Sequence, residues 1–211
     1  MPQGGDYLRD PAAIYQASFA AIRREAAIDR LPPAMQPVAL RLIHACGMPE
    51  ILVDLAWTED AVAAGRRALA AGRPVLVDSS MVAAGIRQSV LPAGNPVVCK
   101  LHEPDAERLA SEGATTRAAA AVDLWQDDLS GALVAIGNAP TALFRLLEVL
   151  AGGAPTPAVV LGFAVGFVGA AEAKEALISH RPQIPHIALR GRRGGSALAA
   201  AAVNALAMEA P

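Results

Sequence analysis

The sequence has few charged residues, few aromatic residues and few cysteines. Charged residues make up 18% of the 211 residues, aromatic residues make up 4%, and the formal net charge at pH 7 is −2. This balance excludes a nucleic-acid-binding protein that relies on a strongly basic surface. It also excludes a stacking platform for single strands, which needs more aromatic side chains. Intrinsic disorder is excluded too, because 54% of the residues are hydrophobic.

The sequence also lacks a long apolar run and a targeting signal. The most apolar stretch, 158–171, contains three glycines and ends before Glu172, so it is shorter than the ~20 residues that cross a bilayer. The N-terminus has no basic region followed by an apolar stretch, so we expect no signal peptide and no membrane partner. Cys46 and Cys99 are too few for a disulfide framework or a paired-cysteine metal site. We therefore expect a protein of the reducing cytoplasm.

The length of the chain is typical of one domain, and the sequence pattern changes once along it. Asp10 and Pro11 are typical of a helix start, a second helix is expected over 34–46, and Gly47 is a typical residue to end that helix. Beyond this point, short apolar runs alternate with alanine-rich segments of helical pattern. We expect a single domain over 1–211, with a helical extension over 1–47 and a core over 48–211.

This alternation of apolar runs and helical segments predicts an α/β fold with a mostly parallel sheet. No internal repeat or linker divides the chain. We expect one doubly wound sheet, flavodoxin-like or Rossmann-like, with helices covering both faces. The expected strands are 51–55, 74–77, 97–101, 133–136, 158–161 and 186–189. The expected helices of the core are 59–71, 115–129, 141–150, 172–179 and 195–207.

Three successive expected strands end in glycine-bearing loops that lead into helices, and these loops begin at Gly137, Gly162 and Arg190. In sheets of this kind, ligands bind in the loops beyond the carboxyl ends of the strands. Free backbone N–H groups at helix starts favour anions. A tight turn needs glycine in any case, so one such loop is a weak signal. Three of them, the last of which holds three arginines, favour an anionic ligand.

Nucleotide-binding and metal-binding motifs are absent or imperfect. Gly162, Gly166 and Gly169 only approach the dinucleotide fingerprint, and neither a Walker loop nor a nucleophile elbow is present. The four histidines form no paired metal-binding motif. We therefore expect neither a metal nor a cofactor.

His44 stands near the end of the second expected helix, three residues after Arg41, so the two side chains share one helix face. Histidine is suited to donating and recovering a proton near neutral pH, but at a helix end it is commonly a cap or a structural group. Tyr15 and Ser18 have the same spacing, and Arg117 opens an alanine-rich helix. These three residues are equally compatible with a solvated surface. The residues alone thus indicate an α/β protein with an anion-binding edge and a candidate general acid.

Several sequence blocks follow one another through nearly the whole chain. They are 10–19, 43–47, 91–95, 115–119, 135–141, 165–174 and 190–196. The most specific motifs are HACG at 44–47, AIGNAPTALF at 135–144 and GFVGAAE at 166–172. In this order the blocks resemble the precorrin-8X methylmutase family of cobalamin biosynthesis.

The resemblance implies an isomerase that moves a methyl group from C-11 to C-12 of precorrin-8X and gives hydrogenobyrinic acid. It implies that His44 donates a proton to the macrocycle, that no metal or redox cofactor takes part, and that the chain forms a homodimer. The many carboxylates of such a substrate suit arginines and helix N-termini. The residues to which we assign substrate binding are Tyr15, Ser18, Arg41, Arg117, Gly137, Asn138, Arg190, Gly194, Gly195 and Ser196.

Three alternatives stay open at this point. The first is a methylmutase that acts on cobalt-precorrin-8 instead of the metal-free substrate. The second is a corrinoid carrier without catalytic activity, in which His44 would have no purpose. The third is an unrelated flavodoxin-like protein that binds FMN or NAD.

Overall fold

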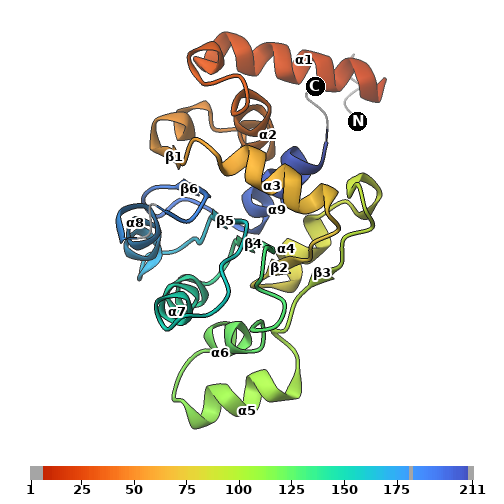
Figure 1. The fold of residues 1–211 in the computed structure, drawn as a ribbon. Helices are drawn as coiled ribbons and strands as arrows, with labels where there is room; N and C mark the ends of the chain where they lie inside the picture. The colour runs from red at the N-terminus through yellow and green to blue at the C-terminus, as the bar shows by residue number, and fades with distance from the viewer. Residues whose placement is uncertain (1–6, 181–182, 209–211) are drawn as a thin grey trace, which may run out of the picture.

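A computed structural model describes residues 7–180 and 183–208 of the chain. Its strands form one sheet in the order β1-β6-β5-β4-β2-β3 (Figure 1). Neighbouring strands are parallel, except that β1 runs antiparallel to β6. The strands are β1 Leu55–Trp57, β2 Val75–Val77, β3 Val97–Val98, β4 Leu133–Ile136, β5 Val159–Gly162 and β6 His186–Leu189. The predicted α/β fold with a mostly parallel sheet is therefore confirmed.

Helices cover both faces of this sheet, and each face has its own apolar core. In β4, Leu133 and Ala135 face one core, while Val134 and Ile136 face the other. This two-sided burial explains why the strands are unbroken apolar runs. Helices α2, α3 and α9 pack in the first core, and α6, α7 and α8 pack in the second. The helices are α1 Pro11–Glu25, α2 Gln36–Cys46, α3 Ala61–Ala70, α4 Ser80–Gly85, α5 Pro104–Glu112, α6 Arg117–Asp123, α7 Pro140–Ala151, α8 Ala170–His180 and α9 Ser196–Ala207.

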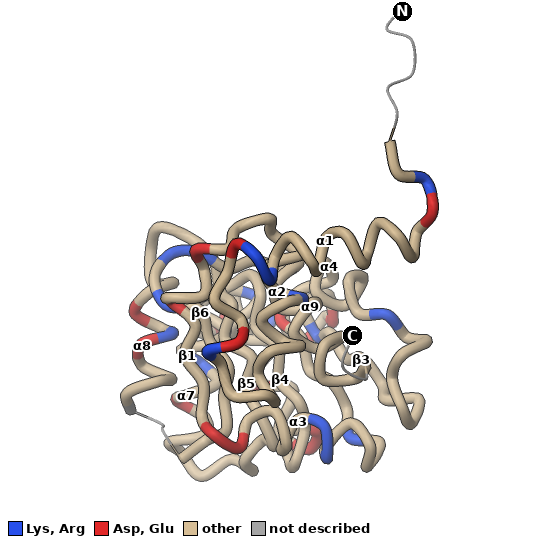
Figure 2. The backbone as a smooth tube through the Cα atoms, turned by 90° about the horizontal axis from the view of Figure 1, so that it is seen from above, with Lys and Arg blue, Asp and Glu red and all other residues tan. Residues whose placement is uncertain are grey.

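The start of α1 and the end of α2 lie where the sequence predicts, whereas α2 begins at Gln36 instead of residue 34. The Asp10 carboxylate accepts a hydrogen bond from the Ala13 N–H at 2.7 Å and caps α1. Helix α2 ends at Gly47, whose φ of 68° lies in the left-handed region that favours glycine. Helix α1 packs against α2, and its first turns project beyond the body of the domain (Figure 2).

The predicted strand 51–55 is wrong. Pro49 starts a short 3₁₀ helix, Pro49–Asp54, and only Leu55 joins a strand. Proline fixes φ near −65° and lacks an N–H, which suits the first turn of a helix. Within this turn Ile51 is buried and Val53 is exposed, so the apolar run does not mark a buried strand.

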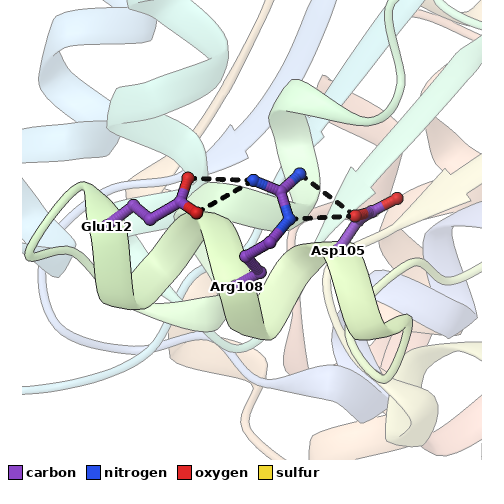
Figure 3. A network of polar contacts seen from close by, with 3 residues as sticks. All are labelled: Asp105, Arg108 and Glu112. Atoms are coloured by element: carbon purple, nitrogen blue, oxygen red, sulfur yellow. Dashed lines mark hydrogen bonds and ion pairs between the residues drawn. The ribbon is translucent and has the colours of Figure 1, made fainter.

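Two further predictions differ from the structure, and two helices of the structure were not predicted. Helix α6 ends at Asp123 instead of continuing to 129, β3 is limited to Val97–Val98, and the helices α4 and α5 were not predicted. Helix α5 buries only small side chains, Ala106 and Ala110, so its apolar pattern is weak. On its exposed face Arg108 binds Asp105 and Glu112 (Figure 3). Exposed ion pairs of this kind contribute little to stability.

None of the helices in the described part of the chain is long and apolar enough to cross a bilayer.

Candidate active site

His44 lies in the last turn of α2, beside α1, where three side chains hold its ring. The Ser18 hydroxyl oxygen is 2.8 Å from His44 Nδ1. The Tyr15 ring stacks on the imidazole with 5.2 Å between centroids, and the Phe19 ring meets it edge-on at 5.4 Å. When Ser18 donates to Nδ1, the neutral imidazole carries its proton on Nε2. The exposed His44 side chain is thus held in one orientation, with Nε2 left for a ligand.

Two small cavities lie beside His44. One of about 120 Å³ is walled by Tyr15, Arg41, Arg87 and the C-terminal half of α9. The other, of about 160 Å³, lies between the ends of α1 and α2 and includes Ser18. A pocket that encloses a drug-sized ligand has a volume of roughly 300–1,000 Å³. Neither cavity of the single chain therefore encloses a macrocycle.

Arg41 brings a partly buried positive charge to the first cavity. Its guanidinium carbon lies 5.8 Å from the centre of the Phe19 ring. Its Nε is buried and has no hydrogen-bond partner in the described part of the chain. Burial lowers the pKa of Arg41; Tyr15 opposes this effect, and repulsion from Arg87 adds to it. An anion in this cavity would give the guanidinium the partner that it lacks.

Arg87 is a candidate site residue that the sequence did not reveal. It follows α4, and its backbone N–H donates to Asn204 Oδ1 at 2.9 Å. Its guanidinium lies 3.9 Å from the Met208 sulfur and lines the same cavity as Arg41. No local pattern could have found it, because a contact across 117 residues with α9 places it beside His44.

The loop after β4 already holds a carboxylate of the protein itself. Asp78, 1% exposed, follows β2. It accepts hydrogen bonds from the N–H groups of Gly137, Asn138 and Ala139 at 2.8, 2.8 and 2.6 Å. Burial raises the pKa of Asp78, and the three hydrogen bonds oppose this shift. The expectation that Gly137 and Asn138 offer free N–H groups to an anion is therefore wrong, although the Asn138 side chain is exposed.

The same contacts bear on nucleotide binding. Apart from β1, the strand order β3-β2-β4-β5-β6 is that of a flavodoxin-like sheet. Such a sheet binds its ligand where the order reverses, which here is between β2 and β4. Asp78 follows β2 and occupies the loop after β4. A second negative charge, such as a phosphate, would meet this carboxylate instead of free N–H groups.

The arginines of the loop before α9 are engaged within the protein. Arg190 pairs with Glu175 of α8, and Arg193 pairs with Asp54. The Arg192 guanidinium lies 5.3 Å from the centre of the Phe167 ring. Arg190 also lies outside the cavities beside His44 and lines a different cleft along β1.

The backbone of this loop rests on the loop after β5. A Cβ atom at Gly194 would lie 2.2 Å from the Phe163 carbonyl oxygen, so only glycine fits there. The Gly195 N–H donates to the same carbonyl at 2.8 Å, which contradicts the expectation of a free N–H at this position. Ser196 is buried, with its hydroxyl 3.3 Å from that of Ser79.

Arg117 lies apart from the His44 cluster. It is exposed at the first position of α6, which Thr116 caps. The Thr116 hydroxyl is 2.7 Å from that of Thr141, so the starts of α6 and α7 lie together, next to the Asn138 loop. The structure thus brings Tyr15, Ser18, Arg41 and His44 into one cluster. It places the other predicted site residues in the loops after β4 and β6 and at the starts of α6 and α9. In the residues that the structure describes, no group of three or more metal-binding side chains is found.

Comparisons with known proteins agree with the resemblance in the sequence. The sequence profile described as precorrin-8X methylmutase matches residues 13–209. The precorrin-8X methylmutase of Pseudomonas aeruginosa is 55% identical over 97% of this chain and 98% of its own length. The cobalt-precorrin-8 methylmutase of Methanothermobacter thermautotrophicus is 37% identical over 85% and 82% of the two chains. The solved precorrin-8X methylmutase from Thermus thermophilus superposes with a TM-score of 0.84, at 42% identity over 93% of this chain and 94% of that one.

Proposed function

The chain belongs to the precorrin-8X methylmutase family and is an isomerase, and on that premise we propose that it moves a methyl group from C-11 to C-12 of precorrin-8X, giving hydrogenobyrinic acid. The observation that carries this proposal is the imidazole of His44, oriented by Ser18 and Tyr15 beside two arginines. Identity favours the metal-free substrate over cobalt-precorrin-8. The relative at 55% identity is named for precorrin-8X, and the one at 37% is named for cobalt-precorrin-8.

His44 supplies the acid–base chemistry in this proposal. Protonation of the ring-C nitrogen or of an adjacent position makes the macrocycle electron-poor, which eases migration of the methyl group. As an imidazolium, His44 gives up the proton of Nε2 while its Nδ1–H donates to the Ser18 oxygen; this leaves a neutral imidazole, and Nε2 takes a proton back after the shift. The methyl group stays on one face of the macrocycle and no group leaves, so positioning provides the rest of the catalysis.

The arginines recognise the carboxylates of the substrate. Arg41 and Arg87 share the cavity beside His44, and the part of its lining that the structure describes contains no acidic residue. A guanidinium binds a carboxylate through two parallel hydrogen bonds. Arg117 and the Asn138 side chain are exposed at a second place and suit the outer carboxylates.

A homodimer in the cytoplasm is part of the proposal. The cavities beside His44, at about 120 and 160 Å³, leave most of a macrocycle uncovered by one chain. The projecting α1 segment exposes apolar side chains that a second copy would bury, namely Tyr7, Leu8, Ile14 and Tyr15. Two unpaired cysteines suit a reducing compartment. Light scattering at micromolar concentration should give twice the mass of the 21.6 kDa chain, and a mass near one chain would contradict the dimer.

The decisive experiment is an absorption spectrum of the purified protein with precorrin-8X. We expect the spectrum of the rearranged corrin to appear, and to appear faster than with cobalt-precorrin-8. A carrier would bind hydrogenobyrinic acid and leave precorrin-8X unchanged. A nucleotide-binding protein would instead show a higher melting temperature with FMN or NAD, and either of these results would overturn the proposal.

A further inference from the structure

Helix α9 is almost entirely apolar, and Asn204 is the only residue in it with an amide side chain. This side chain binds the main chain of the segment after α4 at two points. Its Nδ2 donates to the Gly85 carbonyl at 3.0 Å, and its Oδ1 accepts from the Arg87 N–H at 2.9 Å. A side-chain amide carries a donor and an acceptor side by side, so it can pair with the main chain as a peptide group does. Asn204 thus joins the end of α9 to the residue that carries the Arg87 guanidinium.

The packing of α4 on α9 sets the width of the gap that Asn204 spans. A Cβ atom at Gly85 would lie 2.7 Å from the Ala200 Cβ, so the end of α4 rests directly on α9. The missing side chain at Gly85 allows this approach. Because the two helices are fixed against each other here, the short asparagine side chain reaches both of its main-chain partners.

The same turn of α9 also contacts the guanidinium end of Arg87. The Asn204 carbonyl accepts a hydrogen bond from the Met208 N–H at 3.1 Å, which places Met208 at the end of α9. The Met208 sulfur lies 3.9 Å from Nη1 of Arg87. Asn204 therefore acts on Arg87 twice, directly at its main chain and through Met208 at its guanidinium.

Arg87 needs this support because its surroundings favour another position. Its side chain is exposed, and Arg41, which lines the same cavity, repels it. Repulsion between like charges would move a free side chain away from the cavity and into solvent. A long side chain also loses rotamer entropy when it binds a ligand, and an anchor that acts before binding reduces this cost.

We propose that Asn204 is a positioning residue of the active site, which holds Arg87 beside Arg41 at the cavity next to His44. Its effect on substrate rests on the proposed function, whereas its hold on Arg87 does not. Asn204 acts through Arg87, so it contributes to affinity for the carboxylates of the substrate. The proton transfer belongs to His44, so turnover of the bound substrate should depend little on Asn204.

The first test compares Asn204→Leu with Asn95→Leu. Leucine has a similar size and removes both the donor and the acceptor. Asn95 is a matched control because its amide also joins main-chain groups, the carbonyls of Leu69 and Arg73, and it does not line the cavity. A loss that follows from lowered stability alone would appear in both variants.

Asn204→Leu should weaken binding of hydrogenobyrinic acid about ten-fold and raise KM for precorrin-8X by a similar factor. Its kcat should stay within about two-fold of the wild-type value. Asn95→Leu should lower the melting temperature and leave affinity and KM unchanged. Unchanged affinity in Asn204→Leu would overturn the positioning role.

A double-mutant cycle separates action through Arg87 from other effects. In the Arg87→Ala background, Asn204→Leu should weaken binding by less than about two-fold, because the residue that it positions is absent. A full ten-fold loss in that background would show that Asn204 affects binding without Arg87, and it would overturn the proposal.

Hydrogen exchange tests the hold on Arg87 in the wild type and without any ligand. Relative to its intrinsic rate, the Arg87 amide should exchange at least about five-fold more slowly than that of Gln88, which has no acceptor in the described part of the chain. Asn204→Leu should remove this difference. The wild-type measurement uses no variant, so it decides the question even if Asn204→Leu does not fold.

The outcomes separate this proposal from the proposed function. Equal exchange at Arg87 and Gln88 in the wild type would overturn the hold on Arg87 and leave the enzyme assignment intact. Slow exchange at Arg87, with no binding of hydrogenobyrinic acid by the wild type, would overturn the proposed function and support the hold on Arg87. Slow exchange together with a non-additive cycle supports both.

Discussion

The cluster around His44 and the loops at the carboxyl edge of the sheet use their polar groups in opposite ways. In the cluster, Arg41 Nε has no partner in the described part of the chain, and Arg87 faces the same cavity. In the loops, Asp78 takes three backbone N–H groups, and Glu175 pairs with Arg190. One region leaves its donors available, and the other has already paired them.

This difference indicates where binding energy for a substrate arises. A donor that is paired inside the protein gains little from a ligand, because the ligand must first replace the existing partner. A buried donor without a partner gains the whole hydrogen bond. We therefore expect the His44 cluster to supply chemistry and affinity, and the sheet-edge loops to supply shape.

The largest expected effect lies in the His44 cluster. His44→Ala should lower turnover by about 10²–10⁴-fold, the usual contribution of a general acid or base. It should keep much of its affinity for the product, because the proton is needed mainly in the transition state. Single-turnover spectroscopy with precorrin-8X and a product-binding titration measure the two quantities.

His44→Gln is the stricter form of this test. Glutamine retains a hydrogen-bond donor but cannot transfer a proton at neutral pH. Near-normal turnover in a variant with an unchanged melting temperature would make His44 a positioning group only, and the proton would then come from another residue.

The next effect concerns stability at the sheet edge. Asp78→Ala leaves three backbone N–H groups without their acceptor, so we expect a loss of about 3–5 kcal/mol in the free energy of unfolding. Asp105→Ala, on the exposed face of α5, is the matched control and should change it by less than about 1 kcal/mol. Urea denaturation measures both, and equal effects would contradict the anchoring role of Asp78.

The pH dependence of this difference has a defined sign. Burial raises the pKa of Asp78 above its unfolded value, so the folded state holds this proton more tightly. The stability due to Asp78 is therefore greatest at low pH and falls as the pH rises through the folded-state pKa. The gap between wild type and Asp78→Ala should be smaller at about pH 8 than at about pH 4.5.

A smaller effect is expected at Arg87. Arg87→Ala should weaken product binding by about 1.5–3 kcal/mol, the range for hydrogen bonds to charged groups, and the loss should shrink as salt rises. Arg117→Ala should show a loss of the same size if the substrate reaches the start of α6. Calorimetric titration at two salt concentrations measures both changes in affinity. Unchanged affinity in either variant would show that this arginine is a solvated surface residue that does not bind the product.

The smallest effect is expected at Arg190, which completes the comparison. Its guanidinium is paired with Glu175, so Arg190→Ala should weaken product binding by less than about 1 kcal/mol. A loss as large as that at Arg87 would show that the substrate displaces Glu175, and the distinction between the two regions would then fail.

The sequence predicted those parts of the fold that depend on local pattern. The strand runs 133–136 and 186–189 coincide with β4 and β6, because strands buried on both faces are apolar at every position. The start of α1 and the end of α2 follow from Asp10 and Gly47. Helix α5 escaped prediction because local charges and two buried alanines replace an apolar stripe.

The site was predictable only in part, for a related reason. Spacing places His44 and Arg41 on one face of a helix, and the family resemblance adds Tyr15 and Ser18. Arg87 depends on a contact 117 residues away, and Asp78 reaches a loop 59 to 61 residues further along the chain. A short stretch of sequence does not contain both members of such a pair. The hydrogen-bond donors that are free for a ligand could therefore not be distinguished, from sequence, from those already paired within the protein.

The antiparallel strand β1 has a consequence for the order in which the protein is assembled. It is made early in synthesis, but it pairs with β6, with Leu55 opposite Leu189. Ala201 and Asn204 of α9, which emerge from the ribosome later still, wall the cavity beside His44. Pairing over such sequence distances is slow. A nascent chain therefore carries His44 through most of translation without this cavity, which forms only when α9 is added.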